Sequence, residues 1–321
     1  MEELQLDSQT IEAGSSTATI HAISYKGWRD CICLDNGVIR AIVVPAIGRV
    51  MQLSRKGDEA GCFWENPVLV GRLHETSSDE WINFGGDKSW PAPQAEWPRR
   101  QGRDWPPPVG FDARPMRAEV QGRSVVLTSE IDPGYGIQQV RRVELDAEAP
   151  VMRICTEFHK LSGSPMRVAV WTITQLREPE LLAVREATHS AFAGGFDRQL
   201  PTEPWKLQRV DGVLSFARHP RRCTKAGVET AAMVWVGKNS MVRIESRSDE
   251  GDEARIFPEG GCRSEIYTNP DPLAYVELET LGPLVELKPG DSTERTAIYT
   301  VLPRTMDNAA EEAVRVLEQG R

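Results

Sequence analysis

Two glutamates in the segment Leu273–Pro283 have the residue type and spacing that acid–base chemistry needs. If this segment is a β-strand, Glu277 and Glu279 share one face, since side chains alternate along a strand. Their Cα atoms are then roughly 6–7 Å apart. On a face that lines a cavity, mutual repulsion and loss of water raise the pKa of at least one carboxyl group, and such a group suits a general base. A solvated sheet face with arginine partners is the other interpretation.

The segment Asn83–Gln94 combines flat aromatic rings with directional polar groups. Its two adjacent glycines permit a close backbone approach or a positive φ. The side chains that fit a pyranose, which has apolar faces and a rim of hydroxyls, are Asp87, Lys88, Trp90, Gln94 and the nearby Trp97. A turn with a solvent-facing Asp–Lys pair, and with tryptophans that anchor it to the core, is the alternative that the sequence leaves open.

Other kinds of site have little support in the sequence. The five histidines are scattered, and of the six cysteines only Cys31 and Cys33 are close together, without a second pair or a neighbouring histidine. No phosphate-binding loop and no Gly-x-Ser-x-Gly motif is present. We therefore expect reduced thiols, no metal and no cofactor.

The charge balance argues against nucleic acid as a partner. Lys and Arg number 38 against 47 Asp and Glu, a net charge of −9, whereas nucleic-acid binding needs a basic face. No run approaches the roughly 18 apolar residues that span a bilayer, and the acidic, polar segment 1–10 does not resemble a secretory signal. We expect a cytoplasmic protein with neither nucleic acid nor membrane as partner.

Period-two patterns dominate the chain and predict an all-β fold of antiparallel sheets. In Val151–His159, Met152, Ile154 and Phe158 fall on one face. Similar runs are 38–44, 124–130, 140–146, 167–174, 229–236, 241–246, 274–281 and 296–302. One helix is predicted over about 307–319, with Asp307 as its N-cap. No linker is evident, and we expect one domain spanning residues 1–321.

Residues 64–115 break this pattern. Five of the nine tryptophans lie from Trp64 to Trp105, and seven prolines lie from Pro91 to Pro115. Because proline donates no hydrogen bond to a strand neighbour, we predict a long ordered loop system that covers one mouth of the sheet, and not central strands. Loops of this length are usually functional.

Four stretches, in this order, resemble the galactose-mutarotase-like superfamily of aldose 1-epimerases and hexose-6-phosphate epimerases. They are Asn36-Gly-Val-Ile-Arg-Ala-Ile-Val-Val-Pro-Ala-Ile-Gly48, Gly85-Gly-Asp-Lys-Ser-Trp-Pro91, Val109-Gly-Phe-Asp-Ala-Arg114 and Leu278-Glu-Thr280. The resemblance covers about residues 36–303. The sequence of segment 83–94 resembles that of a branch of this superfamily without an assigned substrate.

The resemblance implies a β-supersandwich with a sugar cleft on one concave sheet. It also implies that Glu279 removes the proton of the anomeric hydroxyl while an acid protonates the ring oxygen. Where the superfamily has histidines, this chain has Val109 and Trp171, which do not titrate near neutral pH. We expect Lys88 to replace the acid.

The resemblance places the ligand, a small sugar or sugar derivative, among further side chains. Trp171 adds a stacking surface, and Arg114 and Gln175 add polar contacts to those of Asp87, Lys88, Gln94 and Glu277. Three functions stay open: an aldose 1-epimerase-like isomerase, a non-catalytic sugar-binding or sensing module, and a carbohydrate-active enzyme of another reaction class on the same fold.

Overall fold

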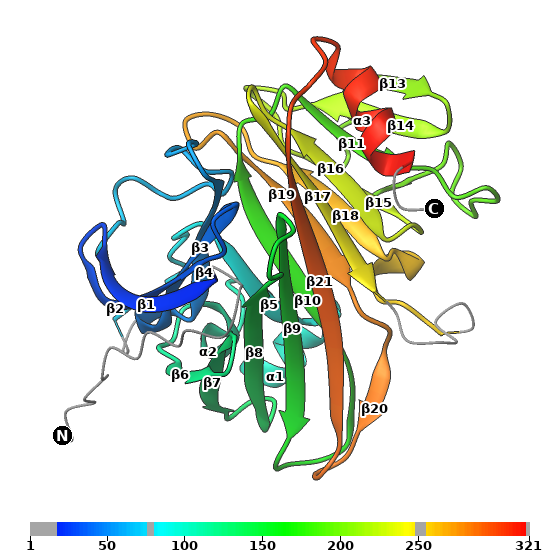
Figure 1. Ribbon diagram of the computed structural model, residues 1–321. Helices are drawn as coiled ribbons and strands as arrows, with labels where there is room; N and C mark the ends of the chain where they lie inside the picture. Colours follow the sequence, from blue (N-terminus) through cyan, green and yellow to red (C-terminus); the bar gives the residue numbers. More distant parts are fainter. Residues whose placement is uncertain (1–17, 76–79, 248–254, 319–321) are drawn as a thin grey trace.

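Two antiparallel sheets form the body of the protein (Figure 1). The structure, a computed structural model, describes residues 18–75, 80–247 and 255–318. In spatial order, the 11-stranded sheet contains β1 (Thr19–Tyr25), β2 (Trp28–Asp35), β3 (Ile39–Val44), β4 (Arg49–Arg55), β5 (Asp87–Ala92), β10 (Met166–Arg177), β19 (Tyr275–Leu281), β18 (Ser264–Thr268), β15 (Thr224–Val228) and β12 (Asp197–Arg198), with β20 (Val285–Leu287) paired to β10 beside this path.

The 10-stranded sheet packs against it. In spatial order it contains β13 (Trp205–Val210), β14 (Val213–Ala217), β11 (Leu181–Arg185), β16 (Ala232–Val236), β17 (Ser240–Arg247), β21 (Ser292–Pro303), β9 (Val151–Lys160), β8 (Ile137–Leu145), β7 (Ser124–Asp132) and β6 (Arg117–Gln121). The all-β antiparallel architecture predicted from the sequence is therefore confirmed.

Alternating burial explains how the two sheets come together. In β9, Met152, Ile154 and Phe158 are fully buried, while the residues between them are mostly half-buried. The main core lies between the sheets and is built from such positions on both, for example Leu278 of β19 and Val242 of β17. Burying one face of each sheet is the main stabilising contribution in a sandwich of this kind.

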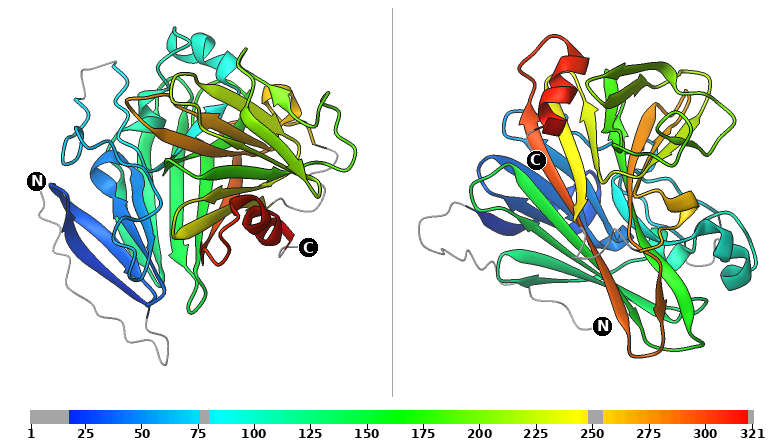
Figure 2. Two further views of the ribbon diagram at one scale, coloured as in Figure 1. Left: turned by 90° about the horizontal axis from the view of Figure 1, so that it is seen from above. Right: turned by 90° about the vertical axis from the view of Figure 1, so that its right-hand side faces the viewer.

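The C-terminal helix α3 (Ala309–Glu318) agrees with the prediction over its described residues, but its cap differs. Asn308, and not Asp307, accepts hydrogen bonds from the backbone N–H groups of Ala310 and Glu311. The apolar side of α3 packs on the outer face of the 10-stranded sheet, against β11 and β16 (Figure 2).

The tryptophan- and proline-rich segment 64–115 is not only a loop system. It contains β5 and two short helices, α1 (Trp97–Gln101) and α2 (Val109–Asp112), and β5 is a central strand between β4 and β10. The prediction that no part of it pairs centrally is wrong. Among the described strands, β5 pairs with β4 only through Val50 and Asp87, so Pro91 has a strand neighbour on one side, β10. No described strand pairs with its other side, and the missing N–H of proline therefore costs no hydrogen bond between strands there.

Candidate functional site

The candidate site lies on the face of the 11-stranded sheet that points away from the other sheet. Strand register decides which side chains meet there, because residues directly opposite each other share a face. Lys88 of β5 is opposite Ile173 of β10, and Ile173 is opposite Glu279 of β19. Glu279 in turn is opposite Glu265 of β18. Two residues along the strands in one direction, Gln175 and Glu277 are opposite each other, and two residues in the other direction, so are Trp90 and Trp171.

Most of the predicted site residues are therefore brought together. We define the carboxylate–lysine cluster as Lys88, Lys225, Glu265, Glu277 and Glu279. Three of these were predicted from the sequence, and Lys225 and Glu265 were not. The alternation in β15 and β18 is too short to single out these two residues, and only the strand order β19–β18–β15 places them beside Glu279.

Glu279 is the best-held carboxylate of the cluster. The indole Nε1 of Trp171 donates a hydrogen bond of 2.7 Å to Glu279 Oε2, and Lys225 Nζ lies 3.2 Å from the same oxygen. Lys225 Nζ also forms a 2.8 Å ion pair with Glu265. Only 1% of Glu279 is exposed. Trp171 thus donates a hydrogen bond that orients the carboxylate, although its indole cannot transfer a proton near neutral pH.

Burial and charge together set the protonation of this group. Burial raises the pKa of Glu279 well above its ordinary value; Lys225 opposes that effect and Glu265 adds to it. Burial alone lowers the pKa of Lys225, but Glu279 and Glu265 reverse this, so that it lies above the ordinary lysine value. Two carboxylates facing one ammonium group leave one excess negative charge, and a proton is readily taken up there.

Lys88 and Glu277 form a second, looser pair. Lys88 Nζ lies 3.5 Å from Glu277 Oε1, and the amide of Gln175 donates a 2.8 Å hydrogen bond to that same oxygen. The ammonium group also lies 4.9 Å from the centre of the Trp90 ring. Burial lowers the pKa of Lys88, while Glu277 opposes this effect.

The buried ion pair between Arg49 and Asp112 holds Trp90 in place. Its Nε1 donates a 2.8 Å hydrogen bond to Asp112 Oδ1, which also accepts one of 2.9 Å from Arg49. Arg49 donates a further hydrogen bond of 2.8 Å to the carbonyl of Gly85. Arg49 of β4 therefore fastens helix α2 and the start of β5 to each other, which fixes the Trp90 ring on the site face.

The other tryptophans form a packed group around Trp90. Trp97 is fully buried, its Nε1 donates to the carbonyl of Pro91, and its ring lies 5.6 Å from that of Trp90. It supports the site and presents no open face. Trp105, which the sequence did not single out, stacks 6.2 Å from Trp97 and is 45% exposed.

The structure does not bring Asp87 to this face. Asp87 is fully buried between the two sheets, where it forms an ion pair with Arg141 and accepts hydrogen bonds from Thr174 and Tyr299. The reason is the strand alternation: in β5 neighbouring residues point to opposite faces, so Asp87 and Lys88 cannot act as one pair.

Two further predicted contacts lie outside the cluster. The backbone N–H of Gln94 donates to Glu259, and its side-chain amide contacts the carbonyl of Asp104 at 3.5 Å, so Gln94 is fixed within the loops beside the site. Arg114 and Val109 line a pocket of about 710 Å³ with Arg100, Arg103 and Asp132, and no residue of the carboxylate–lysine cluster lines it.

The double glycine serves packing in the structure. Gly85 and Gly86 have φ values of 95° and 72°. A Cβ on Gly85 would lie 2.2 Å from the carbonyl oxygen of Trp64, and one on Gly86 would lie 2.6 Å from that of Val50. The glycines thus allow the chain to pass between neighbouring backbones as it enters β5.

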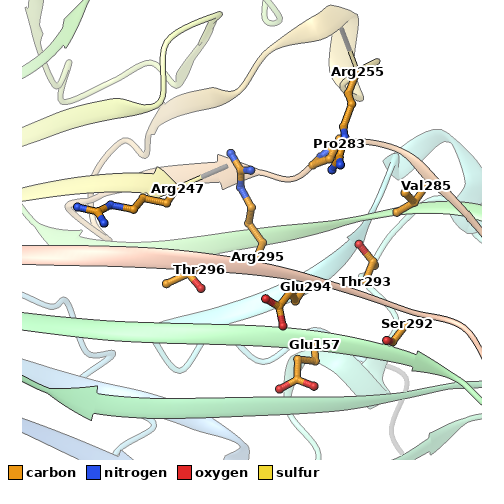
Figure 3. A pocket seen from close by; sticks show the side chains of 10 residues that line it. All are labelled: Glu157, Arg247, Arg255, Pro283, Val285, Ser292, Thr293, Glu294, Arg295 and Thr296. Atoms are coloured by element: carbon orange, nitrogen blue, oxygen red, sulfur yellow. The ribbon is translucent and has the colours of Figure 1, made fainter. Parts of the chain in front are cut away.

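A separate pocket of about 420 Å³ lies along β21 (Figure 3). Glu157 and Glu294 are directly opposite each other on β9 and β21, and their carboxylates and the Cys155 thiol lie within 4.8 Å of one another. Among the described residues this is the group whose spacing suits a metal ion. This group lies on the 10-stranded sheet, whereas Glu279 lies on the 11-stranded sheet. The absence of a metal stays a prediction.

Within the described ranges, no helix has both the length and the apolar character required to cross a membrane.

No family model and no curated protein matches the sequence. Solved structures do match. A protein from Klebsiella pneumoniae subsp. pneumoniae, provisionally named an aldose 1-epimerase, aligns with a TM-score of 0.57 and 9% identity over 94% of this chain and 86% of its own. A galactose mutarotase-like protein from Lactobacillus casei gives 0.54 and 10%, over 84% and 99%.

A longer protein matches as well. The chain spans about half the length, 48%, of a TPR-domain containing protein from Parabacteroides distasonis, with a TM-score of 0.55 and 15% identity over 86% of this chain. At these identities the likeness concerns the course of the backbone. The chain has the β-sandwich fold of the galactose mutarotase-like and aldose 1-epimerase structures, as the sequence motifs predicted.

Proposed function

We propose that the protein binds an uncharged sugar at the carboxylate–lysine cluster and interconverts its anomers. The observation that carries this proposal is the setting of Glu279, a buried carboxylate with a raised pKa that Trp171 and Lys225 hold on the site face of this fold. A group of this kind suits the removal of a proton from an anomeric hydroxyl.

The charges of the cluster favour an uncharged ligand. Its two lysines face three glutamates, and Lys88 Nζ lies 3.5 Å and Lys225 Nζ 2.8 Å from the nearest carboxylate oxygen. A phosphate or carboxylate on the ligand would add to this excess of negative charge in a site that is largely withdrawn from water. Repulsion of that kind is costly where the dielectric screening is weak.

Lys88 is the side chain that can supply the second proton. Ring opening needs an acid at the ring oxygen while the base acts on the anomeric hydroxyl. Lys88 projects from the same face as Glu279, and burial lowers its pKa, which makes its ammonium group a better acid than an exposed lysine. Trp90 and Trp171, with ring centres 5.4 Å apart, provide the apolar surface beside it.

Polarimetry on anomerically pure hexoses tests this function. Glu279→Gln removes the base but keeps the shape, and we expect mutarotation to fall by a factor of about 10²–10⁴, the usual contribution of one acid–base group. Glu286→Gln, at an exposed position of β20, is the matched control and should leave the rate unchanged. Wild-type rates equal to those of buffer across the hexoses would refute catalysis.

Sugar binding without turnover is the second candidate. This alternative is favoured by the fact that Glu279 Oε2 already has two partners within the protein, Trp171 Nε1 and Lys225 Nζ. This alternative predicts that a sugar quenches tryptophan fluorescence in a saturable way, that Trp90→Ala abolishes the quenching, and that mutarotation stays at the buffer rate.

A further inference from the structure

Lys88 has a buried amine that makes no hydrogen bond to any residue that the structure describes. The residue is 1% exposed, its Nζ has no hydrogen-bond partner among the described residues, and the nearest carboxylate oxygen of that part of the chain, on Glu277, lies 3.5 Å away. Leaving such a group unsatisfied is costly and uncommon in folded proteins. The three donors of Lys88 therefore point to an interaction that the protein alone does not supply.

The other two lysines in protected positions are held differently. Lys225 Nζ lies 2.8 Å and 3.2 Å from two carboxylates, and Lys160 Nζ donates a 2.5 Å hydrogen bond to the carbonyl of Tyr135. Both amines are engaged by the protein, and Lys225 in addition is kept charged. Lys88 differs from both, because its nearest carboxylate oxygen lies 3.5 Å away and no hydrogen bond to a described residue holds its amine on the site face.

The charges around Lys88 come from several elements. Glu277 and Glu279 of β19 favour the ammonium form, as does Asp112 of α2, whereas burial and the guanidinium of Arg49 of β4 oppose it. Burial is the largest of these effects, and the pKa of Lys88 is lowered. An ordinary lysine, with a pKa of about 10.4, is neutral in only about one molecule in 2,500 at pH 7, and each unit of lowering raises that fraction about tenfold.

We propose that Lys88 forms a Schiff base with the carbonyl group of an aldehyde ligand, such as the open-chain form of an aldose. This inference rests on the proposed function only for the identity of the ligand. If Lys88 gives its proton to the ring oxygen, the neutral amine that remains faces the aldehyde that ring opening has just produced. A desolvated lysine amine is an established kind of nucleophile toward carbonyl groups.

The bond changes balance without a further reactant. The lone pair of Nζ bonds to the carbonyl carbon, the carbonyl π electrons move to oxygen, and a proton passes from nitrogen to that oxygen, giving a carbinolamine. The nitrogen lone pair then forms the C=N bond as the C–O bond breaks, and the hydroxyl leaves with a proton as water. Glu277 lies 3.5 Å from Nζ and can carry these protons, and Gln175 holds its carboxylate in position.

Trapping with glycolaldehyde and sodium cyanoborohydride tests this inference on the full chain. The hydride reduces the C=N bond to a stable secondary amine, and peptide mapping by mass spectrometry then locates it. Near pH 7 we expect one adduct per chain at Lys88, at least about tenfold more than at any exposed lysine. Lys225 and Lys160 should remain unmodified. Lys88→Met should remove the adduct, and the exposed-site control Lys238→Met should keep it.

Labelling of exposed lysines with none at Lys88 would overturn the inference, as would a full adduct in Lys88→Met. If Lys88→Met does not fold, the map of the wild-type protein decides alone. Polarimetry on the same preparation separates this inference from the proposed function. An adduct without mutarotation refutes catalysis and leaves the Schiff base standing. Mutarotation without an adduct refutes the Schiff base and leaves catalysis standing.

Discussion

Replacing Lys225 by Met tests whether one ammonium group keeps the two carboxylates of the site together. Lys225 Nζ lies 2.8 Å from Glu265 and 3.2 Å from Glu279, and both glutamates are almost fully buried. At an effective dielectric constant of about 20, each contact corresponds to roughly 5–6 kcal/mol of Coulomb attraction. Most of this is offset by the loss of hydration, and removing one partner of a buried pair typically costs about 3–5 kcal/mol.

The loss of stability in Lys225→Met should depend on pH. Without the lysine, repulsion between Glu265 and Glu279 raises a folded-state pKa further above the unfolded value of about 4.3. The folded protein then binds a proton that the unfolded chain does not bind, so its stability falls as the pH rises. Between about pH 5.5 and about pH 8 one such proton is worth up to about 3 kcal/mol.

Urea unfolding followed by tryptophan fluorescence, at about pH 5.5 and about pH 8, measures both the loss of stability and its dependence on pH. We expect Lys225→Met to be about 3–5 kcal/mol less stable than wild type near pH 8 and to recover much of this at the lower pH. Lys238→Met, at an exposed position, should change stability little at either pH. A loss below about 1 kcal/mol near pH 8, or an equal loss at both pH values, would refute this account of the cluster.

Two further substitutions test the supporting structure. Asp87→Asn leaves the guanidinium of Arg141 buried without its carboxylate, and we expect a loss of about 3–5 kcal/mol in urea unfolding; an unchanged midpoint would contradict the interior position of this pair. Gly85→Ala places a Cβ 2.2 Å from the Trp64 carbonyl oxygen, whereas Gly57→Ala adds a Cβ at a similar φ where no atom of the described residues outside the adjoining chain lies within 4 Å. Thermal unfolding should show the Gly85 variant to be clearly the less stable, and equal midpoints would argue against the clash.

Local patterns were sufficient for the strands that alternate strictly. The run 151–159 appears as β9 and the run 274–281 as β19, each within one residue of the predicted bounds. The shared face of Glu277 and Glu279 follows from the same alternation, because a side-chain period of two is a property of any strand. Strands whose sequence does not alternate between apolar and polar residues, such as β5, could not be recognised in this way.

Local sequence patterns were therefore enough to predict the antiparallel β class, the fold-specific motifs and the carboxylate pair on one strand. The three-dimensional fold was needed to show that Lys88 faces the site while its neighbour Asp87 faces the core, and that Lys225 and Glu265 lie beside Glu279. The period along a strand is a local property, whereas strand order, register and the buried face depend on contacts between residues far apart in the chain.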